Sequence, residues 1–263
     1  MYLLQVNRIW AMMLRHLWLQ FRDESRLINF FYWPFFDVLI WSFMSTWAAQ
    51  NNAGILFIPV VGAFFWQAAS RTSADIATSF MDELLSKNLT NIFSSPLRFA
   101  EYMLALMLVC LLRLLVILLL CGVTIWCFTG FNMLMFGWWL IPLLASLFFS
   151  GIIMACLSCA TLLCWGMRAV EFIWVIAWSL SAFIGAFYPI TIMPTAMQMV
   201  GKFLPMTYAF TAVHGFVATG TLSITYLGIS FLLNVIYAIV TLWLLSKAYN
   251  KACNNGLSRL EVD

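Results

Sequence analysis

Long apolar stretches, separated by short polar or charged segments, dominate the hydrophobicity pattern of this chain. Six of them reach roughly 20 residues, the length that an α-helix needs to cross the hydrocarbon core of a bilayer. The third and fourth are longer than a bilayer requires, so we expect them to tilt or to project beyond it. We therefore predict six transmembrane helices, at Phe30–Ala49, Ile55–Ser73, Tyr102–Phe128, Phe136–Leu163, Val170–Phe187 and Tyr226–Ser246.

The composition favours a bilayer as the surrounding solvent. Of the 263 residues, 64% are hydrophobic and 9% are charged, whereas a soluble domain typically carries about 25% charged residues. Apolar stretches recur along almost the whole length and leave no room for a sizeable soluble domain. We predict an all-α integral membrane protein in which residues 1–263 form a single transmembrane domain.

Basic residues concentrate on one side of the predicted spans. Cytoplasmic loops of membrane proteins are enriched in lysine and arginine, so we predict that this side is cytoplasmic and that both termini lie on it. The opposite side carries only Lys202. The basic residues of the predicted cytoplasmic side are Arg8, Arg15, Arg22, Arg26, Lys87, Arg98, Arg168, Lys247, Lys251 and Arg259.

Residues 1–28 are predicted to form an amphipathic helix at the membrane interface. Arg8, Arg15 and Arg22 recur every seven residues and therefore share one helix face. We expect these arginines to reach toward anionic lipid headgroups. Two roles stay open and can both hold: a topology anchor, and a helix that packs on a cytoplasmic partner. The apolar residues on the other faces are Trp10, Leu14, Leu17, Trp18 and Phe21.

A second, shorter amphipathic helix is predicted over residues 82–96, between the second and third spans. Leu85, Leu89 and Ile92 recur at the spacing of one helix face, and Leu84 and Phe93 widen that face. Acidic residues stabilise the start of a helix, and Asp82 and Glu83 lie there. Proline ends a helix, and Pro96 lies at the other end. We predict that this helix lies on the cytoplasmic side and presents an apolar ridge.

Prolines interrupt the apolar segment between the fifth and sixth spans. Pro189, Pro194 and Pro205 fall within residues 188–220. Inside a bilayer, a backbone broken in this way must be buried in protein or line a cavity, and broken hydrophobic segments are typical of transport pathways. We predict two short re-entrant helices, over Pro194–Leu204 and Thr207–Thr219, which enter the outer leaflet and return.

Four ionisable residues lie inside predicted spans or near their ends. Such residues are expensive to bury in lipid, and by default they are candidates for functional sites. Arg71 and Asp75 are four residues apart on one helix face and can pair. We favour a structural ion pair, for example between Asp37 and Arg71 or between Asp37 and Arg113, over a functional site.

Deep tryptophans and a cysteine pair are further candidates for functional residues. Path-lining by the tryptophans is one interpretation, and packing between helices is the favoured one. The spacing of Cys156 and Cys159 is C-x-x-C, but without a second Cys or His cluster, so we predict neither a metal site nor a disulfide. The candidate path-lining residues are Trp41, Trp66, Trp174 and Trp178.

Two sequence motifs resemble the membrane subunit of type-2 ATP-binding-cassette (ABC) exporters. The outer segment reads G-x-x-Y-P-x-x-x-M-P and then L-P-x-T-Y, and the 82–96 helix has an acidic-Leu-Leu start and a Ser-Pro-Leu end. The resemblance implies that the 82–96 helix is a coupling helix that docks on an ATPase subunit through Glu83, Leu84, Leu85, Leu89, Ile92, Phe93 and Pro96. It implies an outer gate that includes Tyr188, Pro189, Pro194, Pro205 and Tyr208.

The same resemblance implies an assembly and a location. Two copies of a cytoplasmic ABC ATPase would bind ATP and Mg, and a second permease, expected to be an identical chain, would complete the path in a bacterial inner membrane. The chain itself carries no G-x-x-x-x-G-K-S/T loop, so we expect no catalysis and no cofactor here. The expected partners are therefore these proteins and membrane lipid, and no nucleic acid is expected to bind.

The substrate class and two other functions stay open. The apolar, aromatic-rich spans suit a hydrophobic small molecule or a lipid-linked molecule, and the alternative within the family is a polysaccharide or glycolipid exporter. From other classes, a passive channel would need a polar stripe along a helix, and a non-transporting membrane scaffold would not need the proline-broken outer segment.

Overall fold

A computed structural model describes residues 5–51 and 57–255. These residues form helices and no strand, which confirms the all-α prediction. In chain order the elements are α1 (Val6–Arg22), α2 (Glu24–Asn51), α3 (Ile58–Leu85), α4 (Leu89–Ser94), α5 (Phe99–Thr129), η2 (Met133–Trp139), α6 (Leu140–Trp165), η3 (Gly166–Ala169), α7 (Glu171–Ile184), η4 (Ile190–Ile192), α8 (Thr195–Lys202), α9 (Pro205–Thr219) and α10 (Ile224–Asn255).

The hydrophobicity of the long helices indicates an integral membrane protein. Within the described ranges, four helical segments are long and apolar enough to cross a bilayer: Glu24–Ala48, Phe99–Thr129, Met133–Trp165 and Ile224–Asn254. The predicted span 55–73 falls on α3, and its residues 55 and 56 lie outside the described part of the chain. The predicted span 170–187 falls on α7, which has 14 residues. α3 is buried along most of its length.

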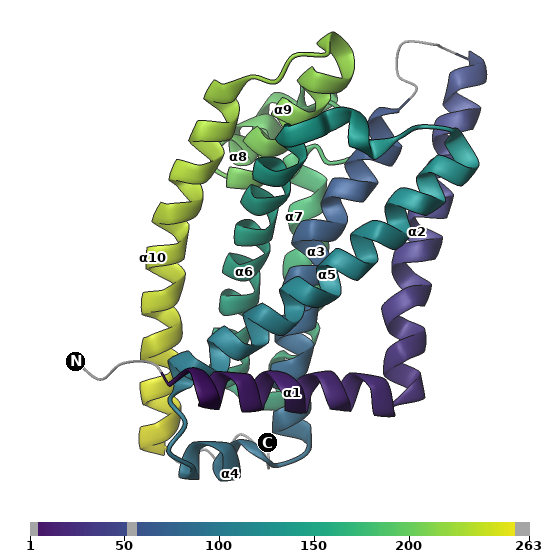
Figure 1. Cartoon of the computed structure of the whole chain (residues 1–263). Helices are drawn as coiled ribbons and strands as arrows, with labels where there is room; N and C mark the ends of the chain where they lie inside the picture. Colours follow the sequence, from purple (N-terminus) through teal and green to yellow (C-terminus); the bar gives the residue numbers. More distant parts are fainter. Residues whose placement is uncertain (1–4, 52–56, 256–263) are drawn as a thin grey trace.

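The long helices run alongside one another, and α1 lies across one end of the bundle (Figure 1). α4 lies at this same end, whereas α8 and α9 lie at the opposite end. We refer to them as the α4 end and the α9 end. Because α1 lies across the long helices, it is parallel to the surface of a bilayer that those helices would cross. This is the orientation of an amphipathic interfacial helix.

The bundle has two main apolar clusters, one toward each end. The cluster toward the α9 end joins the first half of α3 to α5, α6 and α9, and includes Phe65, Phe136 and Phe210. The cluster toward the α4 end joins the second half of α3 to α4, the start of α5 and the end of α10, and includes Phe80 and Leu89. The short α4 is therefore anchored in the bundle core.

Two glycines allow backbones to approach α3 closely. A Cβ atom at Gly151 of α6 would lie 2.6 Å from the carbonyl oxygen of Ala69, and one at Gly62 of α3 would overlap the carbonyl oxygen of Ala186. Real Cβ atoms do not come this near, so both positions need a residue without a side chain. The second contact presses the segment after α7 against α3.

A buried polar network attaches α10 to α6 and α9. The Asn234 amide donates to the Ser146 carbonyl oxygen at 2.9 Å, and the Ser150 hydroxyl donates to the Asn234 side-chain oxygen at 2.7 Å. The Ser230 hydroxyl donates to the Pro205 carbonyl oxygen at 2.7 Å, a group at the first turn of α9. In an apolar environment, satisfied polar groups of this kind fix the register of neighbouring helices.

Candidate functional site

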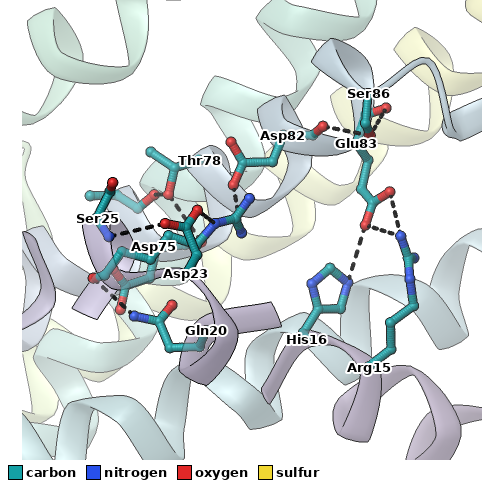
Figure 2. Close-up of polar contacts among 12 residues, drawn as sticks. Arg15, His16, Gln20, Asp23, Ser25, Asp75, Thr78, Asp82, Glu83 and Ser86 are labelled. Atoms are coloured by element: carbon teal, nitrogen blue, oxygen red, sulfur yellow. Dashed lines mark hydrogen bonds and ion pairs between the residues drawn. The ribbon is translucent and has the colours of Figure 1, made fainter. Parts of the chain in front are cut away.

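A cluster of polar side chains joins α1 and the start of α2 to the end of α3 (Figure 2). We call it the α1–α3 cluster, and it lies at the α4 end of the bundle. Its members come from the consecutive helices α1 and α2, with Asp23 between them, and from the distant end of α3, so tertiary packing brings the two parts together. The residues that define it are Arg15, His16, Gln20, Asp23, Arg26, Asp82 and Glu83.

Glu83 is the buried centre of this cluster. Only 2% of the residue is exposed, and its carboxylate lies 2.8 Å from the Arg15 guanidinium. The Asn88 side-chain amide donates to the same carboxylate at 2.9 Å. A buried carboxylate needs partners that offset its desolvation, and here they come from α1 and from the turn before α4. Glu83 therefore attaches both of these segments to the end of α3.

A second ion pair connects the start of α2 to the same end of α3. Arg26 lies 3.0 Å from Asp82 and 3.1 Å from Asp23, and the Gln20 amide donates to the Arg26 carbonyl oxygen at 3.1 Å. Asp23 separates α1 from α2. The corner between these helices is therefore tied to α3 by charge as well as by packing.

The start of α1 is held by α5. The backbone N–H of Gln5 donates to Glu101 at 3.0 Å, and Glu101 also accepts from the backbone N–H of Arg98. Arg8 donates to the Pro96 carbonyl oxygen. Arg8 and Arg15, which were predicted to reach toward lipid headgroups, thus bond to acids and a carbonyl of the same chain and keep about one third of their side chains exposed.

His16 lies beside this ion pair without a hydrogen bond from its Nε2 atom to any described residue. The residue is 3% exposed, and Nε2 lies 3.9 Å from the nearer carboxylate oxygen of Glu83. Burial lowers the pKa of His16 from 6.5 to about 4, against the opposing effect of the Glu83 charge. The imidazole is therefore neutral at pH 7.

A cavity of about 230 Å³ opens between the helices at this site. Its walls combine charged and hydroxyl side chains, so water can be accommodated next to His16. Within the described ranges, no group of three or more His, Cys, Asp or Glu side chains is arranged to hold a metal ion. The lining residues are Arg15, His16, Leu19, Arg26, Ser79, Asp82, Glu83, Ser86 and Asn88.

The predicted ion pairs inside the membrane do not form. Among the described residues, no ion pair joins Asp37 or Asp75 to an arginine. Asp37 instead accepts a hydrogen bond from Gln67 at 2.6 Å. Arg71 donates to the carbonyl oxygens of Asn29 and Phe30, and Arg113 donates to the carbonyl oxygen of His16 at 3.3 Å. Long arginine side chains reach backbone carbonyls of neighbouring helices here, which sequence spacing does not reveal.

The predicted 82–96 helix is divided, and most of its apolar face is buried. α3 continues to Leu85, Lys87 adopts a left-handed conformation with φ 53°, and α4 follows from Leu89. The exposed fractions are 1% at Leu84, 0% at Leu89 and 8% at Ile92. These three residues and Glu83 are therefore not available to another protein, in contrast to the predicted ridge.

An exposed corner remains at the turn between α3 and α4. Leu85 is 56% exposed, and Ser86, Lys87 and Pro96 are also exposed. We call Leu85, Ser86 and Lys87 the α3–α4 corner. The side chain of Phe93, another predicted contact, lies outside the described residues.

The outer segment has the two predicted short helices with slightly shifted bounds. α8 follows Pro194 and α9 begins at Pro205, while Pro189 precedes η4. The hydroxyl groups of Tyr188 and Tyr208 donate to the carbonyl oxygens of Ala182 and Lys202, at 3.0 and 2.9 Å. Both tyrosines thus fasten turns of their own segment, and Nε2 of His214 in α9 lies 3.3 Å from the Ala186 carbonyl oxygen.

The candidate path-lining tryptophans lie in different environments. Trp66 is 3% exposed and packs in the core, so it does not line a surface of this chain. Trp41 stacks on Phe187 with ring centroids 4.2 Å apart, which supports the packing interpretation. Trp174 and Trp178 of α7 are 44% and 61% exposed and remain available to lipid, substrate or a second chain.

The sequence pattern singles out Arg15, Asp82 and Glu83 without indicating that they meet, and it gives His16 no role. The seven-residue arginine repeat and the adjacent acids were the available signals. No protein-family model matches the sequence, and no curated protein was found to match it.

Proposed function

We propose that the chain is the membrane-spanning subunit of an ATP-driven exporter of the type-2 ABC class. ATP and Mg would be bound by two copies of a separate cytoplasmic ATPase subunit, and two copies of this chain would enclose the path. The observation that carries the proposal is the α3–α4 corner, an exposed turn that the buried Arg15–Glu83 pair and the apolar cluster at the α4 end hold rigidly to the bundle.

Rigid attachment is what a force-transmitting element requires. α3 spans most of the bundle from the α9 end to the corner, so a displacement at Leu85 moves α3 as a whole. The corner presents Leu85 for an apolar pocket and Lys87 for an acidic rim, while Asp82 and Glu83 are already paired within the chain. We propose a groove of that chemistry on the ATPase, and the α4 end as the cytoplasmic side.

In this proposal the membrane is crossed six times. The four long apolar segments are joined by α3, whose charges lie within its last four turns and are mostly engaged with α1 and α2, and by α7. The short α7 would be extended across the bilayer by the segment up to Pro194. α8 and α9 would then form the re-entrant outer gate, with the first turn of α9 bonded to Ser230 of α10.

The proposed substrate is a hydrophobic or lipid-linked molecule. α2 exposes a nearly continuous aromatic and aliphatic surface, and only 17% of its apolar segment is buried in this chain. A path between two copies that used α2 and α7 would be apolar and rich in aromatic rings, which favours apolar over ionic cargo. The exposed residues that support this include Trp33, Phe36, Ile40, Trp47, Trp174 and Trp178.

The test is affinity purification of the chain from its native membrane in mild detergent, with identification of co-purifying proteins. We expect a stoichiometric ATPase with a Walker motif, which is lost in the Leu85→Asp and Lys87→Glu variants. Lys202→Glu, the same charge change at the α9 end, is the matched control and should retain the ATPase. If the wild-type chain brings down no such ATPase, the proposal is wrong and a channel or a scaffold takes its place.

A further inference from the structure

We propose that His16 makes the attachment of α1 to the end of α3 sensitive to pH, so that protonation of the imidazole releases α1 from the bundle. The proposal concerns the α1–α3 cluster and does not depend on the exporter function. It rests on the placement of one unpartnered nitrogen among fixed charges.

In the attached state, burial and nearby cations oppose a second proton on His16, and Glu83 alone favours it. The ring is buried between α1 and α5, edge-on to Tyr102 with centroids 6.0 Å apart. Its Nε2 atom, which has no hydrogen-bond partner among the described residues, points to the same carboxylate that Arg15 and Asn88 already occupy. A protonated imidazole would therefore compete with Arg15 for Glu83 instead of gaining a free partner.

The charges that face His16 come from every helix packed around it. Arg15 is on α1, Arg26 on α2 and Arg113 on α5, and all three disfavour a further positive charge. α3 contributes Glu83, which favours it, and the neighbouring Asp82, which is paired with Arg26. Burial adds to the effect of the three cations, since a charged group loses its hydration there.

A cavity lies beside the buried ring of His16. His16 forms part of the wall of the 230 Å³ cavity, whose other lining groups are polar enough to hold water. The Nε2 atom itself is shielded from solvent and faces the Glu83 carboxylate, so its second proton is taken up when α1 detaches and the ring becomes hydrated. The cavity is a space beside the ring that water can enter as α1 opens.

The direction of the effect follows from linkage. The pKa of His16 is about 4 in the attached state and close to 6.5 when α1 is released and the ring is hydrated. The released state binds the proton more tightly, so attachment is complete above pH 6.5 and weakens as the pH falls toward 4. Between these limits the opening equilibrium constant should increase by up to about tenfold per pH unit.

In the proposed exporter, release of α1 would remove one of the two supports of the α3–α4 corner and weaken its coupling to the ATPase. That consequence rests on the proposed function. The release itself belongs to this chain and can be measured without any partner.

The experiment is hydrogen–deuterium exchange of the full chain in lipid nanodiscs, at several values between pH 7.5 and pH 4.5. Peptides from α1 report the opening, and peptides from α10 serve as the internal reference after correction for the intrinsic pH dependence of exchange. We expect protection of α1 to fall several-fold per pH unit below pH 6.5, while α10 stays constant.

Two variants and one control assign the effect. His16→Gln, which is neutral throughout, should remove the pH dependence, and His16→Arg should release α1 even at pH 7.5. His214→Gln removes the second of the chain's two histidines, at the other end of the bundle, and should behave like the wild type. A His16→Gln chain that keeps the wild-type pH dependence would assign it to Asp82 or Glu83 and overturn the proposal, as would constant protection of α1 in the wild type.

Discussion

Breaking the Arg15–Glu83 pair from either side should destabilise the attachment of α1 to different extents. Glu83 is 3% exposed at its side chain, whereas the Arg15 side chain is 34% exposed. Arg15→Met leaves a buried carboxylate with only Asn88 as a strong partner. Glu83→Gln leaves a guanidinium that can turn toward water. The first change should therefore cost more than the second, although both remove the same ion pair.

The magnitude can be worked from this geometry. Removing one partner of a fully buried pair typically costs about 3–5 kcal/mol. The partial exposure of Arg15 and the remaining Asn88 bond lower the cost of Arg15→Met to the lower limit of that range or just below it, at about 2–3 kcal/mol. For Glu83→Gln we expect about 1 kcal/mol, the typical value of one lost hydrogen bond. The double variant should be closer to Glu83→Gln than to the sum, with a coupling energy of about 1–2 kcal/mol.

Exchange protection of the α1 amides at pH 7.5 measures these free energies directly. Arg22→Met is the matched control, because Arg22 lies on the same helix and is exposed, so its substitution should stay within about 0.5 kcal/mol of the wild type. If the two single changes are additive within about 0.5 kcal/mol, the pair contributes no coupling and the reasoning is refuted. Equal costs for the two single changes would also contradict it, because the argument depends on their different exposure.

Two further predictions concern the bundle itself and use thermal unfolding in detergent. Gly62→Ala places a methyl group against the Ala186 carbonyl oxygen and should lower the melting temperature by several degrees, whereas Gly228→Ala, with open space around it, should leave it unchanged or raise it; no loss at Gly62 would contradict the close contact. Asn234→Leu leaves Ser150 without its side-chain acceptor and should cost about 1–3 kcal/mol, so an unchanged melting temperature would show that the network is dispensable.

The hydrophobicity pattern along the chain was sufficient to predict which segments form long apolar helices and which form short or amphipathic ones. An apolar run of about 20 residues can bury its backbone in lipid only as a helix, so the long helices follow from composition and length. The helical period of the arginines and leucines predicted an amphipathic α1 and a short helix near Leu89. Proline limits helices because its ring fixes φ and it has no backbone N–H. Accordingly, α8 lies between Pro194 and Pro205, and α9 begins at Pro205.

Periodicity did not reveal what covers each face. It grouped Leu85, Leu89 and Ile92 on one apolar face, widened by Leu84 and Phe93, but it could not distinguish a partner protein from the chain's own core. Leu84, Leu89 and Ile92 pack into the cluster at the α4 end, whereas Leu85 is exposed. Proximity in sequence also suggested ion pairs such as Arg71 with Asp75. In the structure, Arg71 reaches carbonyl oxygens about 40 residues away instead.

The candidate site depends on contacts between distant segments. Arg15 and Glu83 are 68 residues apart, and nothing in the spacing around either residue specifies the other. Helix formation is governed by neighbours within four residues, which the sequence displays directly. The meeting of α1 with the end of α3, the burial of His16 beside their ion pair and the cavity next to it depend on how whole helices pack, and only the tertiary structure decides that.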